Sequence, residues 1–564
     1  MITFDEDEQN RQLKDLNVKE EEDVVQLLAT TKFNLPYANL TTQTIEPDAL
    51  RLMTQAEAEA AKLALVKLVG KELIVAILSP EIEVTQKAVE ALTTKGYQVS
   101  LVMVSQKSLE HAWTFYEDLS FASTSKKGSF DVEGEILAKL SADIKNIHDV
   151  PTVIEKLTGG SGNVSRIMEA ILAGAITTKA SDVHIELEED RVRLRYRIDG
   201  LLQDIMFMKS ELYKLLVSRI KLLSGLKLTI TNAAQDGRFS IFLDKIEINI
   251  RVSFIPGAYG ESIVMRLLDP RQTQVKLEDM GMDKKLFEVT MGEIAKPNGL
   301  ILTTGPTGSG KTTTLYAFLR KLYNPELKII TIEDPIEYHL GGITQTQVEH
   351  DKNYDFLSGL RAALRQDPDV IMIGEIRDAE TAQTAIDAAL TGHLVFSTLH
   401  TNNAAGVIPR LIQLNVNPKI ISSALTLSIA QRLVRVLCTT CKKQAVLAGN
   451  DEKLVRDIIQ QGIAEGKDFT NEGITPDQVL NVYEPVGCEK CNNTGFKGRI
   501  GVYEIIKTDA DIEKVTDENP SEREIKKIAE KQHIFDMKED GIIKVLKGVT
   551  SLAELRTSVD LLED

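Results

Sequence analysis

A glycine-rich loop between an apolar run and a helical segment limits what this chain can fold into more than any other stretch. The loop lies within residues 299–315, GLILTTGPTGSGKTTTL, and carries the pattern G-x-x-x-x-G-K-T. Glycines let successive backbone N–H groups turn toward phosphate oxygens, and the following helix presents its positive N-terminal end. The alternative is a Gly/Ser/Thr-rich turn, but the flanking strand and helix signals match the context of a phosphate-binding loop. The sequence therefore predicts a nucleotide site here.

The residues of this loop have two expected roles. Lys311 is expected to reach the β- and γ-phosphates of ATP, and the Thr312 hydroxyl is expected to bind Mg²⁺. The other residues offer backbone amides to the phosphates. The predicted ATP-binding residues of the loop are Gly305, Pro306, Thr307, Gly308, Ser309, Gly310, Lys311, Thr312 and Thr313.

Composition limits the partners of such a site. The chain has 83 acidic and 66 basic residues, and its net charge is −17. This balance, with 5% aromatic residues, argues against the basic or aromatic-lined channel of a nucleic-acid translocase, the main rival interpretation. The N-terminal segment MITFDEDEQN lacks signal-peptide features, and no apolar run approaches the roughly 18 residues of a membrane span. We therefore expect a cytoplasmic protein that meets a membrane only through partners.

The length of 564 residues indicates three or four domains. Polar stretches and changes of hydrophobic pattern divide the chain further. The predicted segments are an acidic tail (1–34), an N-terminal α/β docking module (35–122), a linker (123–150), a second α/β domain (151–285), an ATPase domain (286–437), a tetracysteine element (438–500) and a helical C-terminal region (501–564).

Apolar strand candidates alternate with helical segments in the predicted ATPase domain. This alternation predicts an α/β fold with a largely parallel sheet and helices on both faces, and ligands bind such sheets at the carboxyl ends of the strands. The strand candidates are 300–303, 328–332, 370–373 and 394–398, and the helical segments are 312–322, 356–364 and 380–390.

Polar motifs follow three of these strands. Glu337 ends the motif EDPIE, and Glu375 lies in GEIRD, where the usual second nucleotide-site motif has Asp. ATP hydrolysis needs a group that orients or deprotonates water and acidic groups that hold Mg²⁺ through its water shell. His400 follows the next strand and is better placed to contact a γ-phosphate than His393, which precedes it. We therefore predict Glu337, Glu375, Lys311 and His400 as catalytic residues.

Several arginines lie in strand patterns of the preceding domain. The segment RVRLRYRI, residues 191–198, places four arginines on one strand face, most simply a solvated sheet surface. Arg251 and Arg266 instead interrupt strongly apolar strand patterns, so each needs a partner. Either each arginine pairs with a carboxylate of its own domain, or both face a negative ligand at an interface. The residues alone leave these two alternatives open.

The cysteines form two CxxC pairs, Cys438 with Cys441 and Cys488 with Cys491, and no other cysteine occurs in the chain. Four thiolates fit a tetrahedral Zn²⁺ site, with redox activity and free thiols as the alternatives. A filled coordination shell leaves no position for substrate, so the predicted zinc is structural. The 46 residues between the pairs require an inserted segment.

Taken together, the motifs resemble the secretion ATPases of type II secretion and type IV pilus assembly, the GspE/PilB group. The resemblance runs from about residue 163 to the C-terminus, and residues 37–119 resemble one copy of the family's N-terminal module more weakly. The motifs that carry it are ASDVHIE, RYRIDG, QDGRFS, GPTGSGKTTTLY, TIEDPIE, RQDPDVIMIGEIRD, TGHLVFSTLHTN, QRLVR and the two CxxC pairs.

The resemblance implies a PAS-like fold for residues 151–285 and a P-loop, RecA-like fold for the ATPase domain at 286–437. It also implies a homo-hexameric ring in which ATP lies between one subunit and the preceding domain of its neighbour. It gives Glu375 the Walker B role, Glu337 water activation and His400 γ-phosphate sensing, and it brings Arg251 and Arg266 to the nucleotide across the interface. Inner-membrane platform and cytoplasmic adaptor proteins are the implied partners. Pilus or pseudopilus assembly is expected rather than retraction, since retraction motors generally lack the N-terminal module and the tetracysteine element. The longer module that binds cyclic di-GMP in some relatives is not visible, so that ligand is not predicted.

Overall fold

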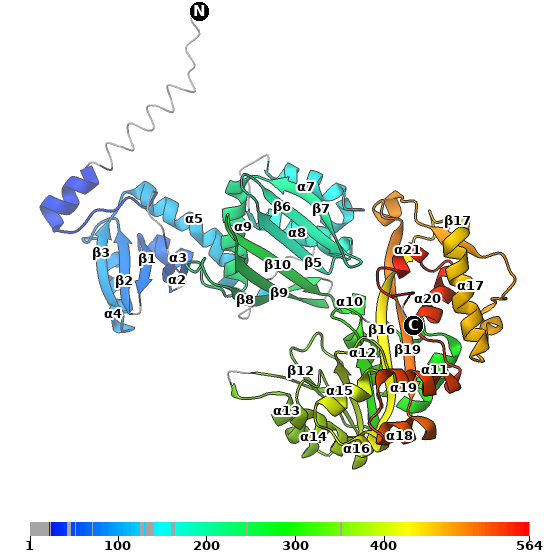
Figure 1. The fold of residues 1–564 in the computed structure, drawn as a ribbon. Coiled ribbons are helices and arrows are strands. Elements are labelled where there is room, and N and C mark those ends of the chain that lie inside the picture. The colour runs from blue at the N-terminus through cyan, green and yellow to red at the C-terminus, as the bar shows by residue number, and fades with distance from the viewer. Residues whose placement is uncertain are drawn as a thin grey trace, which may run out of the picture.

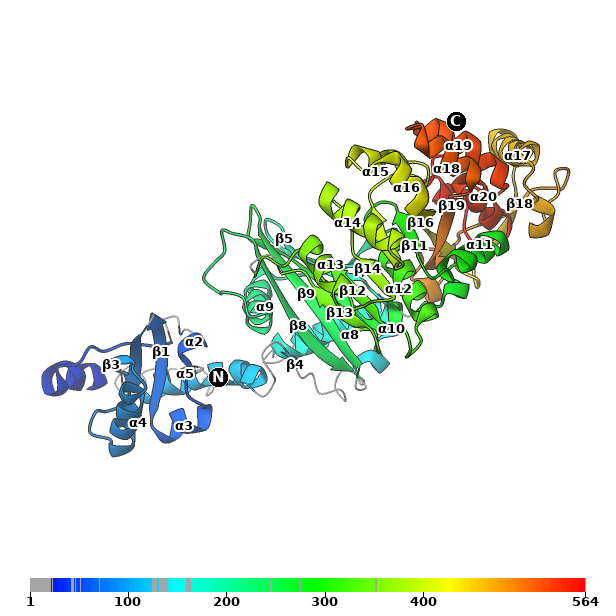
Figure 2. The same cartoon turned by 90° about the horizontal axis from the view of Figure 1, so that it is seen from below.

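The computed structural model describes residues 22–562 except 23, 42–44, 46, 51, 70, 124–128, 131–139, 159–163, 244–245, 274 and 350–351. Three α/β units, each with its own main sheet, follow one another along the chain (Figure 1). We refer to them as the N-terminal, middle and C-terminal units. Figure 2 shows the same row from below, with the middle sheet beside the C-terminal one.

The N-terminal unit is a three-stranded sheet with helices packed against it. Strands β1 and β2 are antiparallel, and β2 and β3 are parallel because α4 forms the crossover between them. The elements are α2 (Pro47–Leu50), α3 (Gln55–Ala60), β1 (Leu63–Val69), β2 (Glu72–Ile77), α4 (Glu83–Thr94), β3 (Gln98–Met103) and α5 (Gln106–Ser123).

The middle unit is a seven-stranded sheet in the order β4-β8-β9-β10-β5-β6-β7. Along β6 every second residue is buried, so the apolar side chains enter the core and the arginines point outward, as predicted. Arg193 and Arg195 pair with Asp204 and Glu186, so this face is a network of ion pairs. The elements are β4 (Ser129–Phe130), α7 (Asp149–Thr158), α8 (Val164–Thr177), β5 (Asp182–Leu187), β6 (Val192–Ile198), β7 (Leu201–Met208), α9 (Ser210–Leu223), β8 (Gln235–Leu243), β9 (Ile246–Pro256) and β10 (Glu261–Leu268).

The C-terminal unit is a seven-stranded sheet in the order β13-β12-β14-β15-β11-β16-β19. Its strands are parallel up to β16, and apolar cores cover both faces, so the predicted α/β sheet is confirmed. The elements up to β16 are α10 (Pro270–Thr273), α11 (Lys284–Ile294), β11 (Gly299–Thr304), α12 (Lys311–Leu322), β12 (Ile329–Glu333), β13 (Thr344–Gln347), α13 (Phe356–Leu364), β14 (Val370–Ile373), α14 (Ala379–Leu390), β15 (Leu394–Leu399), α15 (Val407–Gln413), α16 (Pro418–Ala424) and β16 (Leu425–Leu437).

The predicted helical region at 501–564 differs from the structure at its start. Residues 501–507 belong to the long strand β19, which pairs antiparallel with β16 and completes the main sheet. Helices begin only after this strand. The elements after β16 are β17 (Lys443–Val446), α17 (Gly449–Ala464), β18 (Asn481–Glu484), β19 (Phe496–Lys507), α18 (Ala510–Asp517), α19 (Glu522–Ala529), α20 (Met537–Leu546) and α21 (Leu552–Leu555).

Two segments predicted as peripheral contribute to cores. Ile144 and Ile147, in the predicted linker, are buried in the core of the middle unit, and Ala29, in the predicted acidic tail, is buried against the N-terminal sheet. Apolar side chains within otherwise polar stretches explain this packing. Most of the tail (1–21 and 23) and the linker residues 124–128 and 131–139 lie outside the described residues. Across the ranges that the structure describes, no helix has the length and apolar character needed to span a bilayer.

Phe396 in β15 tests the packing of the C-terminal sheet. Its side chain is fully buried, and its ring centroid lies 5.8 Å from that of Phe318 in α12. We expect Phe396→Ala to lower the free energy of unfolding of this unit by about 3–5 kcal/mol, measured by urea denaturation. The control Tyr259→Ala removes a side chain from a residue that is 58% exposed and should change it by less than about 0.5 kcal/mol. Similar losses in both variants would contradict this packing.

Candidate nucleotide site and four-cysteine cluster

The glycine-rich loop joins the end of β11 to the start of α12. Gly305, Gly308 and Gly310 have φ angles of 141°, 82° and 92°, a region that side chains disfavour. A Cβ atom on Gly305 would lie 2.5 Å from the carbonyl oxygen of Gln431, which leaves no room for a side chain. The loop therefore has the tight, amide-lined form that cradles phosphate.

Gln431 in β16 holds this loop in place. Its side chain is buried, its Nε2 donates a 2.7 Å hydrogen bond to the Ser309 carbonyl, and its Oε1 accepts one of 2.7 Å from Thr314 Oγ1. One amide thus fixes both the loop and the first turn of α12. Nothing in the sequence pattern assigns this role to Gln431, although the motif QRLVR contains it.

Lys311 lies at the entrance of the cradle. Its Nζ donates hydrogen bonds of 2.8 Å and 3.1 Å to the carbonyls of Gly305 and Pro306. Burial lowers the pKa of Lys311, and the negative charge of Glu375 opposes this effect. Thr312 is exposed in the first turn of α12, beside the positive end of the helix. The residues present therefore fit a nucleoside triphosphate and its Mg²⁺.

Glu375 and His400 lie side by side at the carboxyl ends of β14 and β15. His400 Nε2 lies 3.3 Å from Glu375 Oε2, and Arg377 pairs with the other carboxylate oxygen. The ion pair with Glu375 raises the pKa of Arg377. Behind them, Arg432 donates a 2.9 Å hydrogen bond to the carbonyl of Asn402, in the loop after His400. Arg432, which the sequence analysis also missed, thus ties this loop to β16.

The two glutamates of the EDPIE motif have different environments. Glu333 is 2% exposed and accepts hydrogen bonds from Tyr316, Thr331 and Gln345, and burial raises the pKa of Glu333. Glu337 lies at the surface, where its side chain is 36% exposed. Glu337 is therefore the more accessible of the two glutamates, while Glu333 joins the acidic loop to α12.

Arg251 brings the middle unit to this acidic loop. Its guanidinium lies 3.2 Å from Glu337 Oε2 and donates a 2.8 Å hydrogen bond to the Ile336 carbonyl. Arg266 stands directly opposite Arg251 across β9 and β10, and it pairs with Asp182 of its own unit at 2.9 Å. Arg266 therefore follows the first alternative, a carboxylate of its own domain. Arg251 follows neither, because it pairs with a carboxylate of the C-terminal unit of the same chain.

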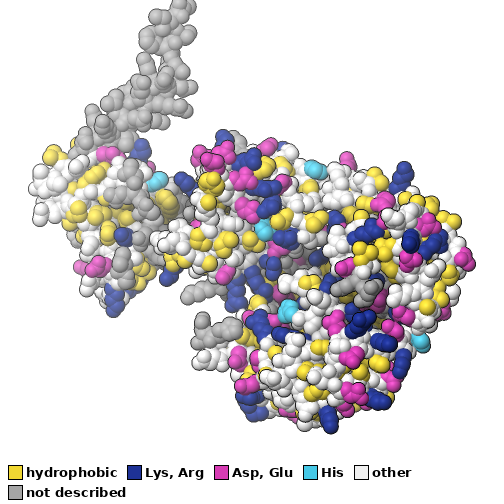
Figure 3. All heavy atoms as spheres, viewed as in Figure 1, with side chains coloured by type: hydrophobic (Ala, Val, Ile, Leu, Met, Phe, Trp, Pro, Cys, Tyr) yellow, Lys and Arg dark blue, Asp and Glu magenta, His cyan; other side chains and the backbone are white. Residues whose placement is uncertain are grey.

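Neighbouring like charges on a sheet repel each other unless anions face them. On the face seen in Figure 3, Lys and Arg side chains gather where the middle unit meets the C-terminal unit. Arg251 and Arg266 each have a carboxylate partner, Glu337 and Asp182. The surplus of positive charge at the border of the units favours a negative ligand there.

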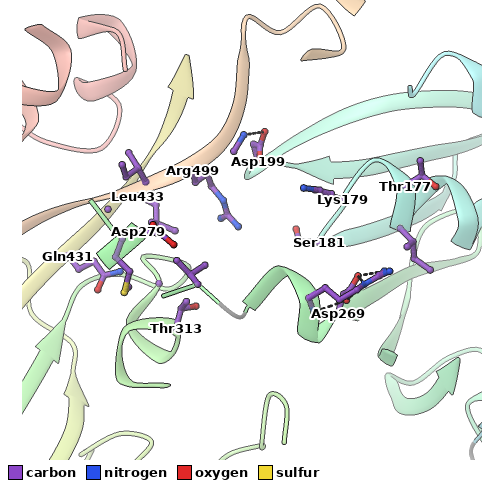
Figure 4. A pocket seen from close by; sticks show the side chains of 18 of the residues that line it. Thr177, Lys179, Ser181, Asp199, Asp269, Asp279, Thr313, Gln431, Leu433 and Arg499 are labelled. Carbon is purple, nitrogen blue, oxygen red and sulfur yellow. Dashed lines mark hydrogen bonds and ion pairs between the residues drawn. The ribbon is translucent and has the colours of Figure 1, made fainter. Parts of the chain in front are cut away.

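A cavity of about 740 Å³ opens beside the cradle, between the middle and C-terminal units. Figure 4 shows Thr313, Gln431 and Leu433 on one side and Lys179 and Ser181 on the other. Its volume is typical of ligand pockets, and its walls mix polar and apolar groups. The cavity thus has room for a nucleoside next to the phosphate cradle.

The four cysteines come together, as their spacing predicts. The Sγ distances are 3.9 Å for Cys438–Cys488, 3.8 Å for Cys441–Cys491 and 3.7 Å for Cys488–Cys491, and all four Sγ atoms lie within 4.8 Å of one another. A tetrahedron with Zn–S bonds of about 2.3 Å has edges of about 3.8 Å. The donor set therefore fits one tetrahedral metal ion with a closed coordination shell.

This arrangement serves phosphate chemistry, because a rigid cradle, an ammonium group and carboxylates meet where parallel strands end. The protein is an ATPase of the P-loop class. Residues 158–557 match the family described as Type II/IV secretion system protein, and residues 33–120 match the MshEN domain. The chain therefore belongs to the Type II/IV secretion system protein family.

Similar proteins include members of both branches that the motifs resemble. The chain is 44% identical to the type II secretion system protein E of Aeromonas hydrophila over 392 residues, which cover 70% of this chain and 75% of that protein. It is 35% identical to the type IV pilus assembly ATPase PilB of Myxococcus xanthus over 529 residues, 93% of this chain and 89% of that one. The fold is similar to that of the Legionella pneumophila ATPase DotB, with a TM-score of 0.50 and 22% identity over 69% of this chain and 94% of DotB.

Gln431→Ala tests whether β16 holds the cradle. The change removes both side-chain hydrogen bonds and leaves buried polar partners behind, so we expect ATP affinity to fall by about tenfold. Titration with a fluorescent ATP analogue measures this effect. Gln413→Ala, at an exposed residue that contacts Arg410, is the matched control and should bind as the wild type does. Unchanged affinity in Gln431→Ala would remove the role assigned to this residue.

Proposed function

We propose that this chain is the subunit of a hexameric ATPase motor that drives assembly of a type IV pilus, or of the related pseudopilus of type II secretion. The contact of Arg251 with Glu337 carries the proposal, because it joins the acidic loop of the nucleotide site to a separate unit. A change at the site then alters a contact that orients the middle unit, which is what a motor requires.

The roles follow from the placement of the side chains. Lys311 would hold the phosphates, and the Thr312 hydroxyl and Glu375 would hold Mg²⁺, which when bound would neutralise charge on the phosphates. Glu337 orients and deprotonates water, since it is the exposed glutamate of its motif. His400, whose Nε2 lies 3.3 Å from Glu375 Oε2, contacts the γ-phosphate, and loss of this phosphate changes the position of the loop that follows His400.

Arg251 and Arg266 bind nucleotide phosphates in this proposal, and both act within their own chain. The contact of Arg251 with Glu337 of the same chain supports this arrangement over supply from a neighbour. A triphosphate beside Glu337 competes with this carboxylate for the Arg251 guanidinium. The triphosphate wins because it carries more negative charge and more acceptor oxygens than the single, partly exposed carboxylate. Hydrolysis and phosphate release return Arg251 to Glu337 and let the middle unit move.

The extent of the similarity favours pilus assembly. The match to the Myxococcus PilB protein includes most of this chain, whereas the type II secretion proteins match over a smaller share. The MshEN match lies on the N-terminal unit, which we propose as the docking module for an adaptor. We place the ring at the cytoplasmic face of the membrane, held there by an inner-membrane platform protein. Zn²⁺ is the metal that we propose for the four cysteines.

Two variants test the catalytic roles. We expect Lys311→Ala to abolish hydrolysis, and Glu375→Gln to retain ATP binding while turnover falls by about 100-fold, because the amide keeps the shape but not the charge. Phosphate release and nucleotide titration measure the two properties. Lys321→Ala, which alters a lysine of the same helix that pairs with Glu278, should turn over normally. Wild-type turnover in Glu375→Gln would refute its assignment.

Mixed rings test where the arginine comes from. Equal amounts of Lys311→Ala and Arg251→Ala subunits, coassembled, should recover no activity if Arg251 serves its own chain. Supply from a neighbour would instead restore roughly a quarter of the sites in a randomly mixed ring. The rate of ATP hydrolysis per ring decides between them, with light scattering to confirm that mixed hexamers form.

A further inference from the structure

The segment Cys488–Gly495, here called the cysteine turn, makes contacts that zinc binding alone does not need. Its Asn492 Oδ1 accepts a 3.3 Å hydrogen bond from the Ile147 amide, and its Asn493 Nδ2 lies 3.4 Å from His148 Nε2. Just beyond it, the Gly498 amide donates a 2.9 Å hydrogen bond to Asp199 Oδ2. Ile147, His148 and Asp199 all belong to the middle unit, so the turn and the start of β19 bridge two units.

The shape of the cysteine turn depends on its sulfur atoms. Asn492 and Asn493 both have left-handed backbone conformations, with φ of 50° and 59°. The Cys488 and Gly495 amides donate hydrogen bonds of 3.2 Å and 3.3 Å to Cys491 Sγ. An ion held by all four thiolates fixes this sulfur, and with it the direction in which the two asparagine side chains point.

The cysteine cluster also stands at the end of the antiparallel ribbon of β16 and β19. Cys438 follows directly on β16, the strand that carries Gln431, and the cysteine turn leads into β19. The contact of Asp199 with the Gly498 amide lies in the wall of the cavity beside the phosphate cradle (Figure 4). The bridge therefore closes one side of the space between the two units.

We propose that the four-cysteine metal site is a latch between the units: a metal bound by the cysteines fixes the cysteine turn in the form that docks on the middle unit and closes the cavity next to the nucleotide. The site then has a positional role in the motor as well as a structural one. The latch holds the units together at one edge of their interface, while Arg251 contacts Glu337 at another.

The amide of Ile147 reports the latch directly, since Asn492 is its acceptor. The variant N492G/N493G removes both side chains at positions whose positive φ suits glycine, so the turn keeps its backbone form. Hydrogen exchange on the full-length protein should show exchange at Ile147 faster by about tenfold, with one metal ion per chain retained by elemental analysis. N519G makes the same change at a left-handed asparagine of the C-terminal helical region and should match the wild type.

Removal of the metal tests its part in the latch. Cys488→Ser should lose the ion and show the same faster exchange at Ile147, and gradual chelation of wild-type protein gives the same test if this variant fails to fold. Unchanged exchange in N492G/N493G would overturn the docking contact. Loss of the ion with the Ile147 amide still protected would overturn the metal dependence.

Discussion

The two hydrogen bonds of the Gln431 side chain hold the glycine-rich loop and the first turn of α12 in one arrangement, and the shape of the nucleotide site depends on them. Glycines permit the left-handed turns of the cradle, but they also give the loop more freedom than any other residues would. Gln431 removes that freedom, because its buried amide binds both Ser309 and Thr314. The rigidity of the phosphate cradle therefore depends on a strand 122 residues further along the chain.

The pattern of apolar residues predicts most strands and helices of the C-terminal unit. It fails for the long strands β16 and β19, which contain charged as well as apolar residues. The short strands around the site are continuously buried, so they are uninterrupted apolar runs, and helices of ordinary length separate them. Strands β16 and β19 instead include Arg432, Arg435 and Arg499, because one part of the ribbon lies in the sheet and the rest extends to the cysteine cluster. Arg432 and Arg435 interrupt the apolar pattern because their partners are residues distant in sequence, so the pattern alone does not predict a strand there.

The site shows the same limit at the level of single residues. Topology places Glu337, Glu375 and His400 beyond the ends of parallel strands, and their order in the chain is enough to predict this. Which glutamate of EDPIE is buried and which stays at the surface depends on Tyr316 of α12, which donates a hydrogen bond to Glu333. The partner of Arg251 lies in another unit, so no pattern within the middle unit could have identified it.

The way in which the units meet explains how such a site can produce movement. Each buried apolar cluster of the described residues lies within one unit. The members of one cluster come from residues 144–267 of the middle unit, and the members of two others come from residues 277–561 of the C-terminal unit. The middle and C-terminal units therefore share hydrogen bonds and ion pairs rather than a common core. Polar contacts of this kind exchange with water at little net cost, whereas separating a shared core would expose apolar surface. In the proposed motor, a ligand that displaces Arg251 from Glu337 would therefore turn one unit against the other while both cores stay intact.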